Sequence, residues 1–147
     1  MRGLSVMEPW ASLIMWGDKD VENRYWWTEY RGPLVICASA KVEPGWTQDD
    51  WDELLEERWV DEGLPIPPEV FVPLKEFVRP GYALGVVELV GIDREMKTRW
   101  DDSGQYHWRL ADKVAFPSPF KQKGALKLYE VDDELVRQGM VINLVRK

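Results

Sequence analysis

The chain has 147 residues, the usual size of one domain, and its 45% apolar and 31% charged residues are typical of a globular protein. No segment approaches the roughly 20 apolar residues of a membrane-spanning helix, and the amino terminus lacks the pattern of a secretory signal, so we expect a cytoplasmic protein with no membrane partner. The single cysteine, Cys37, excludes an internal disulfide, and one cysteine with one histidine argue against a classical zinc site.

The net charge of −7 is distributed unevenly along the chain. Residues 43–62 hold nine acidic residues and one arginine, a local charge of −8, so that the rest of the chain carries +1. We interpret the acidic run as the solvated face of a helix. A basic cleft elsewhere on the surface is compatible with this distribution, and a nucleic-acid partner is therefore not excluded by the acidic composition.

A proline and a glycine delimit the first predicted helix. The sequence predicts a helix over 9–16, because proline suits the first helical position and Gly17 suits the stop after the last one. Residues 21–26 and 32–39 have the composition of strands and are separated by a turn-like segment. We therefore expect these two strands to form a hairpin.

The acidic run is predicted to form a helix over 47–59 that begins with Thr47 as its N-cap. Trp51 and Trp59 lie on this helix, and we expect them to pack it onto the rest of the domain rather than to bind a ligand. Residues 63–81 contain five of the ten prolines, so this part is predicted to be a structured loop with at most a short helical turn.

The second half of the chain is dominated by strands. The best candidate is 82–93, which has apolar residues on both alternations and is therefore expected to be covered on both faces. Shorter strands are predicted over 105–110, 113–119, 124–131 and 140–145. Many short strands with two or three helices indicate an α+β domain over residues 1–147, built as a small β-barrel or as a strongly curved sheet with helices around it.

Charged and aromatic residues are concentrated in the segment "GDKDVENRYWWTEYRG", residues 17–32. In a strand over 21–26, Glu22, Arg24 and Trp26 alternate onto one face, and Lys19 lies on the loop just before it. A carboxylate, a guanidinium and an indole in a row suit the recognition of a heterocycle. The alternative is that Glu22 and Arg24 only neutralise each other while Trp26 belongs to the core.

The same segment is part of a longer pattern of residues at fixed spacing: Pro9, Trp10, Ala11, Ile14, Gly17, Lys19, Glu22, Arg24, Arg31, Gly32, Ile36, Ala38 and Ser39. This pattern resembles the opening of the ASCH domain, a branch of the PUA-like superfamily, which reads approximately Q-P-W-A-x-x-I-x-x-G-x-K-x-x-E-x-R and continues through an R-G turn into I-x-A-S. One departure is Glu8, where many relatives have Gln. If that amide reads a base, a carboxylate at position 8 changes which base is preferred.

The resemblance implies a PUA-like β-barrel of about five to seven strands, with a ligand cleft at its mouth floored by residues 17–24. It implies binding of RNA, or of a modified nucleobase or nucleotide, without a cofactor or a metal. Lys19 would attract phosphate, Glu22 would read the edge of a base, Arg24 would orient Glu22 or contact phosphate, and the rings would stack. The expected ligand-binding residues are Trp10, Lys19, Glu22, Arg24, Trp26, Ser39, Trp108 and Lys123.

Two hydrolytic alternatives use Lys19 and Glu22 as catalytic residues. One ASCH branch resembles an amidohydrolase of a modified nucleoside, but its Thr nucleophile is replaced here by Glu22, and a carboxylate cannot stand in for an activated hydroxyl. The other alternative is a ribonuclease, the only case in which a divalent metal is expected, with Tyr106, His107 or Ser39 as the proton donor beside Lys19. A third alternative is a protein-interaction adaptor that uses the acidic helix 47–59.

Overall fold

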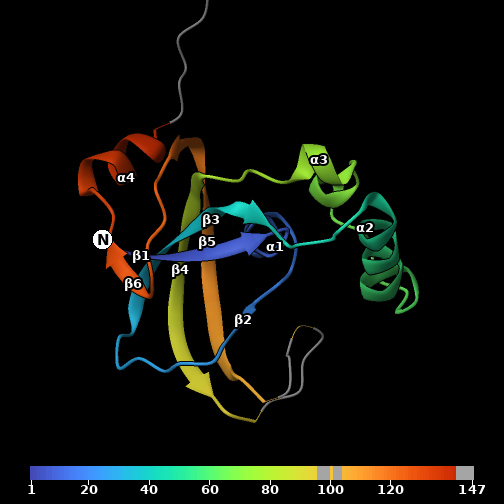
Figure 1. Ribbon diagram of the computed structural model, residues 1–147, viewed down its shortest axis with the longest axis horizontal. Helices are drawn as coiled ribbons and strands as arrows, with labels where there is room; N and C mark the ends of the chain where they lie inside the picture. Colours follow the sequence, from blue (N-terminus) through green and yellow to red (C-terminus); the bar gives the residue numbers. More distant parts are fainter. Residues whose placement is uncertain (96–99, 101–103, 142–147) are drawn as a thin grey trace, which may run out of the picture.

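The computed structural model describes residues 1–95, 100 and 104–141, and the fold of this part is α+β (Figure 1). Its strands are β1 (Arg2–Glu8), β2 (Val21–Arg24), β3 (Gly32–Val42), β4 (Tyr82–Asp93), β5 (Tyr106–Lys121) and β6 (Leu128–Glu130). Its helices are α1 (Trp10–Trp16), α2 (Gln48–Leu55), the π-helix η1 (Glu56–Val60), the 3-10 helix η2 (Pro68–Val70), α3 (Leu74–Phe77) and α4 (Asp133–Gly139). None of these helices is long and apolar enough to cross a membrane.

The six strands form one mixed sheet in the order β2-β5-β4-β3-β1-β6. β1 pairs with β3 in parallel, and every other pair is antiparallel. Figure 1 shows β1 lying across the long strands β4 and β5, so the sheet is strongly curved. Within the described residues the ladder ends at β2 and β6 and does not close, and the closed barrel expected from the family is replaced by a curved open sheet.

The predicted hairpin between 21–26 and 32–39 is wrong. β3 is paired on one edge with β4 and on the other with β1, a strand that the sequence analysis did not predict, so no edge of β3 is left for β2. β2 instead pairs with β5, where Glu22 lies opposite Trp108 and Arg24 lies opposite Tyr106. The pairing of β2 with β5 in place of β3 matters for the site, because it brings the charged residues of β2 next to β5.

The structure also corrects several predicted strand and helix boundaries. The strands predicted over 105–110 and 113–119 are one continuous strand, β5, whose pairing with β4 is irregular at several points. Of the strand predicted over 124–131, only Leu128–Glu130 pairs with β1. Four α-helices stand where two or three were expected, since α3 and α4 were not predicted as separate helices. The strand predicted over 140–145 lies, from residue 142 on, outside the described residues.

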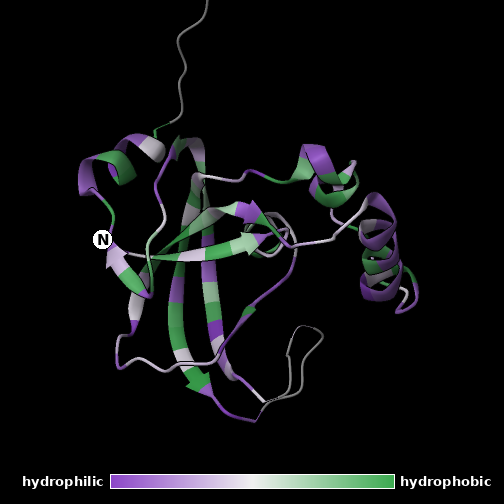
Figure 2. Cartoon of the chain, in the orientation of Figure 1, coloured by the Kyte–Doolittle hydropathy of each residue, from purple (hydrophilic) through white to green (hydrophobic). Residues whose placement is uncertain are grey.

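The acidic helix forms as predicted and is attached by its tryptophans. The Thr47 side chain accepts a hydrogen bond from the backbone of Asp50, and the Asp50 carboxylate accepts one from the Thr47 backbone, which makes a capping box. Trp51 and Trp59 are fully buried, and the Trp51 indole donates to the backbone oxygen of Val72 at 2.9 Å. Figure 2 shows α2 as mostly hydrophilic, with a smaller hydrophobic part.

Three apolar clusters hold the elements together. The largest lies between the sheet and α1 and includes Leu4, Ile14, Leu89 and Trp108. A second cluster joins α1 to α2, η1 and α3 and contains Trp51 and Trp59. The third cluster, around Cys37, packs the sheet against α4. The acidic helix is thus fastened to α1 by a cluster of its own, separate from the cluster beneath the sheet.

Cys37 provides a test of this core. Its side chain is fully buried in the apolar run of β3, and burial raises the pKa of its thiol to about 11. Because the thiolate is the reactive form, we expect alkylation by iodoacetamide at about pH 8 to be very slow in the folded protein and fast in denaturant. Mass spectrometry over time measures both rates, and rapid labelling of the folded protein would contradict this packing.

Candidate functional site

A cleft of about 730 Å³ opens between the sheet and the acidic helix. Its lining comes from β1, the start of α1, β2 with the loop that follows it, the end of β3, η1, and residues Trp100 and Gln105. Six of the eight expected ligand-binding residues line it: Trp10, Lys19, Glu22, Arg24, Trp26 and Ser39. Trp108 and Lys123 are not among the lining residues.

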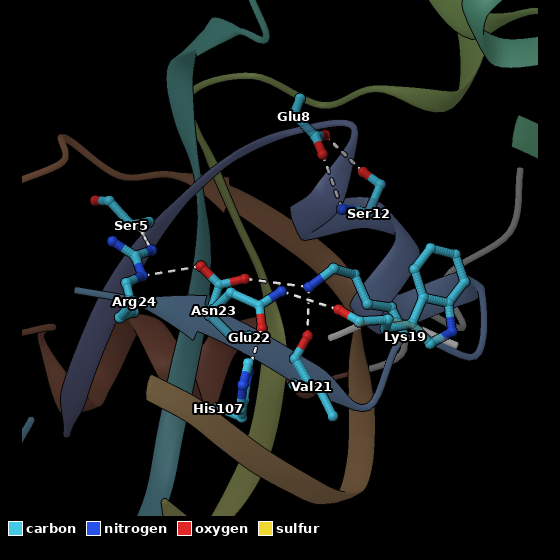
Figure 3. Close-up of polar contacts among 10 residues, drawn as sticks. Ser5, Glu8, Ser12, Lys19, Val21, Glu22, Asn23, Arg24 and His107 are labelled. Carbon is cyan, nitrogen blue, oxygen red and sulfur yellow. Dashed lines mark hydrogen bonds and ion pairs between the residues drawn. The ribbon is translucent and has the colours of Figure 1, made fainter. Parts of the chain in front are cut away.

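The floor of the cleft holds a row of three charged side chains (Figure 3). Lys19 Nζ lies 3.2 Å from Glu22 Oε1, and Arg24 Nε lies 2.9 Å from Glu22 Oε2. Each carboxylate oxygen therefore accepts from a different cation. Arg24 also donates through Nη2 to the backbone oxygen of Ser5, which ties β2 to β1 across the cleft.

Local backbone structure places Lys19 at the centre of this row. α1 ends at Gly17, and the Lys19 backbone N–H still donates to the oxygen of Leu13 at 3.3 Å, so the chain folds back beneath the helix. The side chain is only 5% exposed, and its ammonium donates to the backbone oxygen of Val21 as well as to Glu22. Burial lowers the pKa of Lys19, an effect that the neighbouring Glu22 opposes. Lys19 thus helps to hold the Glu22 carboxylate in position.

Asn23 connects β2 to the far side of the cleft. Its Nδ2 donates to the backbone oxygen of Trp100 at 2.9 Å, and its Oδ1 lies 2.8 Å from Nδ1 of His107. His107 is buried and does not line the cleft, and Tyr106 does not line it either. Among the proton donors considered for a ribonuclease, only Ser39 reaches the cleft, and its hydroxyl donates to the backbone oxygen of Lys41 at 3.0 Å.

The aromatic residues do not form the opposed pair of plates that the sequence suggests. Trp108 is fully buried and packs edge-on against Trp26, with ring centroids 4.8 Å apart, so it supports that ring from the core side. Trp10 and Trp26 line the cleft, and Trp10 packs edge-on against Trp46 at 5.2 Å. β2 ends at Arg24, so Trp26 enters the cleft from the following loop rather than from the strand face.

Glu8, the position where the sequence departs from its relatives, holds the start of α1. Its carboxylate accepts hydrogen bonds from the backbone N–H and the hydroxyl of Ser12, at 2.8 and 2.5 Å, and from the backbone N–H of Arg79 at 2.6 Å. The side chain is completely buried, and burial raises the pKa of Glu8 against the effect of these donors. It does not line the cleft and has a structural role here.

Residues that the sequence analysis did not identify complete the lining. Ser5, Val6 and Met7 come from the unpredicted strand β1, and Arg58 comes from η1. Arg58 is the one arginine of the acidic run 43–62, and the sequence analysis did not place it in a site. The signal available in the sequence is that it is the only basic residue between positions 43 and 62.

The charges of the lining residues favour an anionic ligand. Three cations and two carboxylates line the cleft: Lys19, Arg24, Arg58, Glu22 and Glu43. The cleft is therefore net positive in a chain of net charge −7. In the described part of the chain, no three His, Cys, Asp or Glu side chains come close enough to hold a metal ion.

Glu22 is expected to be essential for stability. Replacing it by Ala leaves Lys19 and Arg24 without their shared carboxylate, and loss of one member of a buried ion cluster lowers the free energy of unfolding by about 3 kcal/mol. Urea unfolding measures the loss. Glu134→Ala is the matched control, because Glu134 pairs with Arg137 on the surface of α4, where little change is expected. Similar small losses in both variants would contradict the burial of the cluster.

Comparison with known proteins identifies the family of the chain. The family described as "ASCH domain" matches residues 4–132. Segments of 38 residues are 58% and 53% identical to proteins named Activating signal cointegrator 1 from Homo sapiens and Mus musculus. Each segment covers 26% of this chain and only 6% of the relative's own length. Because the family match spans most of the chain and contains the charged row of the cleft, the protein belongs to the ASCH domain family.

Proposed function

We propose that this domain binds RNA or a modified nucleotide in the cleft between β2 and the acidic helix. The observation that carries the proposal is the row formed by Lys19, Glu22 and Arg24, which lies in the same open cleft as two indole rings. Such a row offers an acceptor, donors and stacking surfaces to one flat, polar ligand. The family match supports the proposal, since ASCH domains resemble RNA-binding domains of the PUA-like superfamily.

Glu22 is suited to reading the edge of a base. Each of its oxygens accepts one protein hydrogen bond, and a carboxylate oxygen has two acceptor positions, so both oxygens keep one for an exocyclic amine or a ring N–H. Lys19 and Arg24 hold the carboxylate in place. Its orientation is therefore fixed before the ligand binds, which lowers the entropy lost on binding.

Trp26 is the ring best placed to stack on a base. It lines the cleft, and the buried Trp108 fixes it from behind. Stacking on an aromatic side chain contributes about 1–3 kcal/mol per base. Since stacking tolerates any base, Trp26 would supply affinity, and Glu22 would supply the choice of base.

A neighbouring ring gives a matched test of stacking. We expect Trp26→Ala to weaken binding of short single-stranded RNAs and of ribonucleosides by about 10-fold or more, because the stacking contact is lost. Trp27→Ala is the control, since Trp27 is exposed but does not line the cleft. Titration of intrinsic fluorescence or of heat measures the affinities. Equal losses in the two variants, or no binding of any probe by the unchanged protein, would contradict the proposal.

Hydrolysis of the bound ligand is a second candidate, favoured by the Lys19–Glu22 pair in the cleft, whose Nζ and Oε1 atoms lie 3.2 Å apart. General acid–base catalysis requires groups of this kind within hydrogen-bond reach of the ligand. Burial lowers the pKa of Lys19, which eases the loss of its proton. The same RNAs and a panel of modified nucleosides, incubated with the protein and followed by mass spectrometry of bound and released species, separate the two functions. Unchanged probes identify a binding domain, whereas shortened RNA or an altered base identifies a hydrolase.

A substitution on the acidic surface of α2 distinguishes binding or hydrolysis in the cleft from a role as a protein-interaction adaptor. Glu53 is exposed on α2 and does not line the cleft. Glu53→Gln should therefore leave RNA affinity unchanged if the cleft is the binding site. A protein-interaction role, to which the name of the cointegrator relatives gives some support, would instead make this side chain matter for partner binding.

A further inference from the structure

Arg58 brings a guanidinium into the cleft from the wall opposite the strands. It lies on η1, directly after α2, and lines the cleft together with the residues of β1 and β2. The acidic residues around it are exposed on the outer side, whereas the Arg58 side chain is 30% exposed and faces the cleft. The helix thus presents its acids to solvent and its single basic residue to the site.

The guanidinium is fixed in position but forms few polar contacts. Its Cζ lies 5.0 Å from the centre of the Trp100 ring, a cation–π contact. Among the described residues its only ion-pair partner is Glu57, with 3.8 Å between Nη1 and Oε2, and Nε is covered by protein without any hydrogen-bond partner. A covered donor without an acceptor is unfavourable. Arg58 is therefore held by stacking, and its donors are largely uncommitted.

Trp100 fixes this guanidinium relative to the charged row. Its backbone oxygen accepts from Asn23 at 2.9 Å, and its indole N–H donates to Asp18 Oδ1 at 3.1 Å. Trp59, next to Arg58 on η1, packs against the same ring at 5.9 Å. Trp100 thus lies between β2 and η1, and the position of Arg58 is set by contacts on both sides of the cleft.

The other two cations of the cleft are committed to the protein. Arg24 donates to Glu22 and to the backbone oxygen of Ser5, and Lys19 donates to Glu22 and to the backbone oxygen of Val21. Arg58 is thus the cation of the cleft with the most donors left for a ligand. A guanidinium offers a planar fork of N–H groups that matches two oxygens of a phosphate.

We propose that Arg58 binds the phosphate of the ligand whose base contacts Glu22 and Trp26. This inference rests on the proposed function and adds the chemical class of the ligand, a nucleoside phosphate rather than a free base or nucleoside. The phosphate belongs either to a free nucleotide or to the backbone of an RNA strand. Both sources present the same oxygens to Arg58, and the probes below separate them.

The test compares probes that differ only in phosphate. The four ribonucleosides, their 5′-monophosphates and a short single-stranded RNA containing all four bases are titrated into the unchanged protein, Arg58→Gln and Arg58→Lys. We expect Arg58→Gln to weaken binding of the phosphorylated probes by about 10-fold or more and to leave nucleoside binding unchanged, because a charge-assisted hydrogen bond is lost. Arg58→Lys should recover part of the loss, since it restores the charge without the fork.

Arg137→Gln is the matched control. Arg137 is exposed on α4, pairs with Glu134 three residues away and does not line the cleft, so its loss should leave every affinity unchanged. Thermal unfolding of each variant shows whether the fold is intact. Loss with the RNA alone assigns the phosphate to a strand, and loss with the monophosphates as well shows that a free nucleotide is also held.

Four results would overturn the inference. Equal weakening of nucleosides and monophosphates by Arg58→Gln would mean that Arg58 only supports Trp100 and the cleft wall. No weakening of any phosphorylated probe would mean that Arg58 does not contact the ligand. Absence of binding by the unchanged protein overturns the proposed function and this inference together, whereas nucleoside binding as tight as the binding of both the monophosphates and the RNA overturns this inference alone.

Discussion

The site depends on one buried carboxylate shared by two cations. Glu22 lies between Lys19 and Arg24, and each cation is also bonded to a backbone oxygen, of Val21 in one case and of Ser5 in the other. Charges removed from water are unfavourable unless they are paired and hydrogen-bonded. The pairing therefore ties the loop after α1 to β2, and β2 to β1. The same pairing places an acceptor at the floor of the cleft.

The features that the sequence predicts correctly have causes within a few neighbouring residues. α1 is bounded by Pro9 and Gly17, and the acidic helix begins with a capping box at Thr47, so each end is specified locally. The charged row follows from the spacing of Lys19, Glu22 and Arg24 within six residues. Family resemblance added the expectation that these residues lie at a cleft, and all three line one.

The features that the sequence does not predict depend on contacts between distant segments. β2 pairs with β5 because β1 occupies the free edge of β3, and no local pattern shows that competition. Trp108 has the residue type of a stacking plate and lies opposite Glu22 in the ladder, but Trp26 from the loop after β2 packs against it and it is fully buried. Arg58 faces the cleft because Trp59 and Trp100 orient η1, and these rings are 41 residues apart along the chain.

The division of charge on the acidic helix has a consequence for how a polyanion approaches the domain. Exposed carboxylates on the outer face of α2 repel phosphate groups, whereas η1, which directly follows α2, contributes Arg58 to a net positive cleft. Long-range fields of this kind orient a diffusing partner before contact. A nucleic acid strand would consequently be repelled from the acidic side of the molecule and attracted to the cleft side. It would therefore approach the domain preferentially from the cleft side.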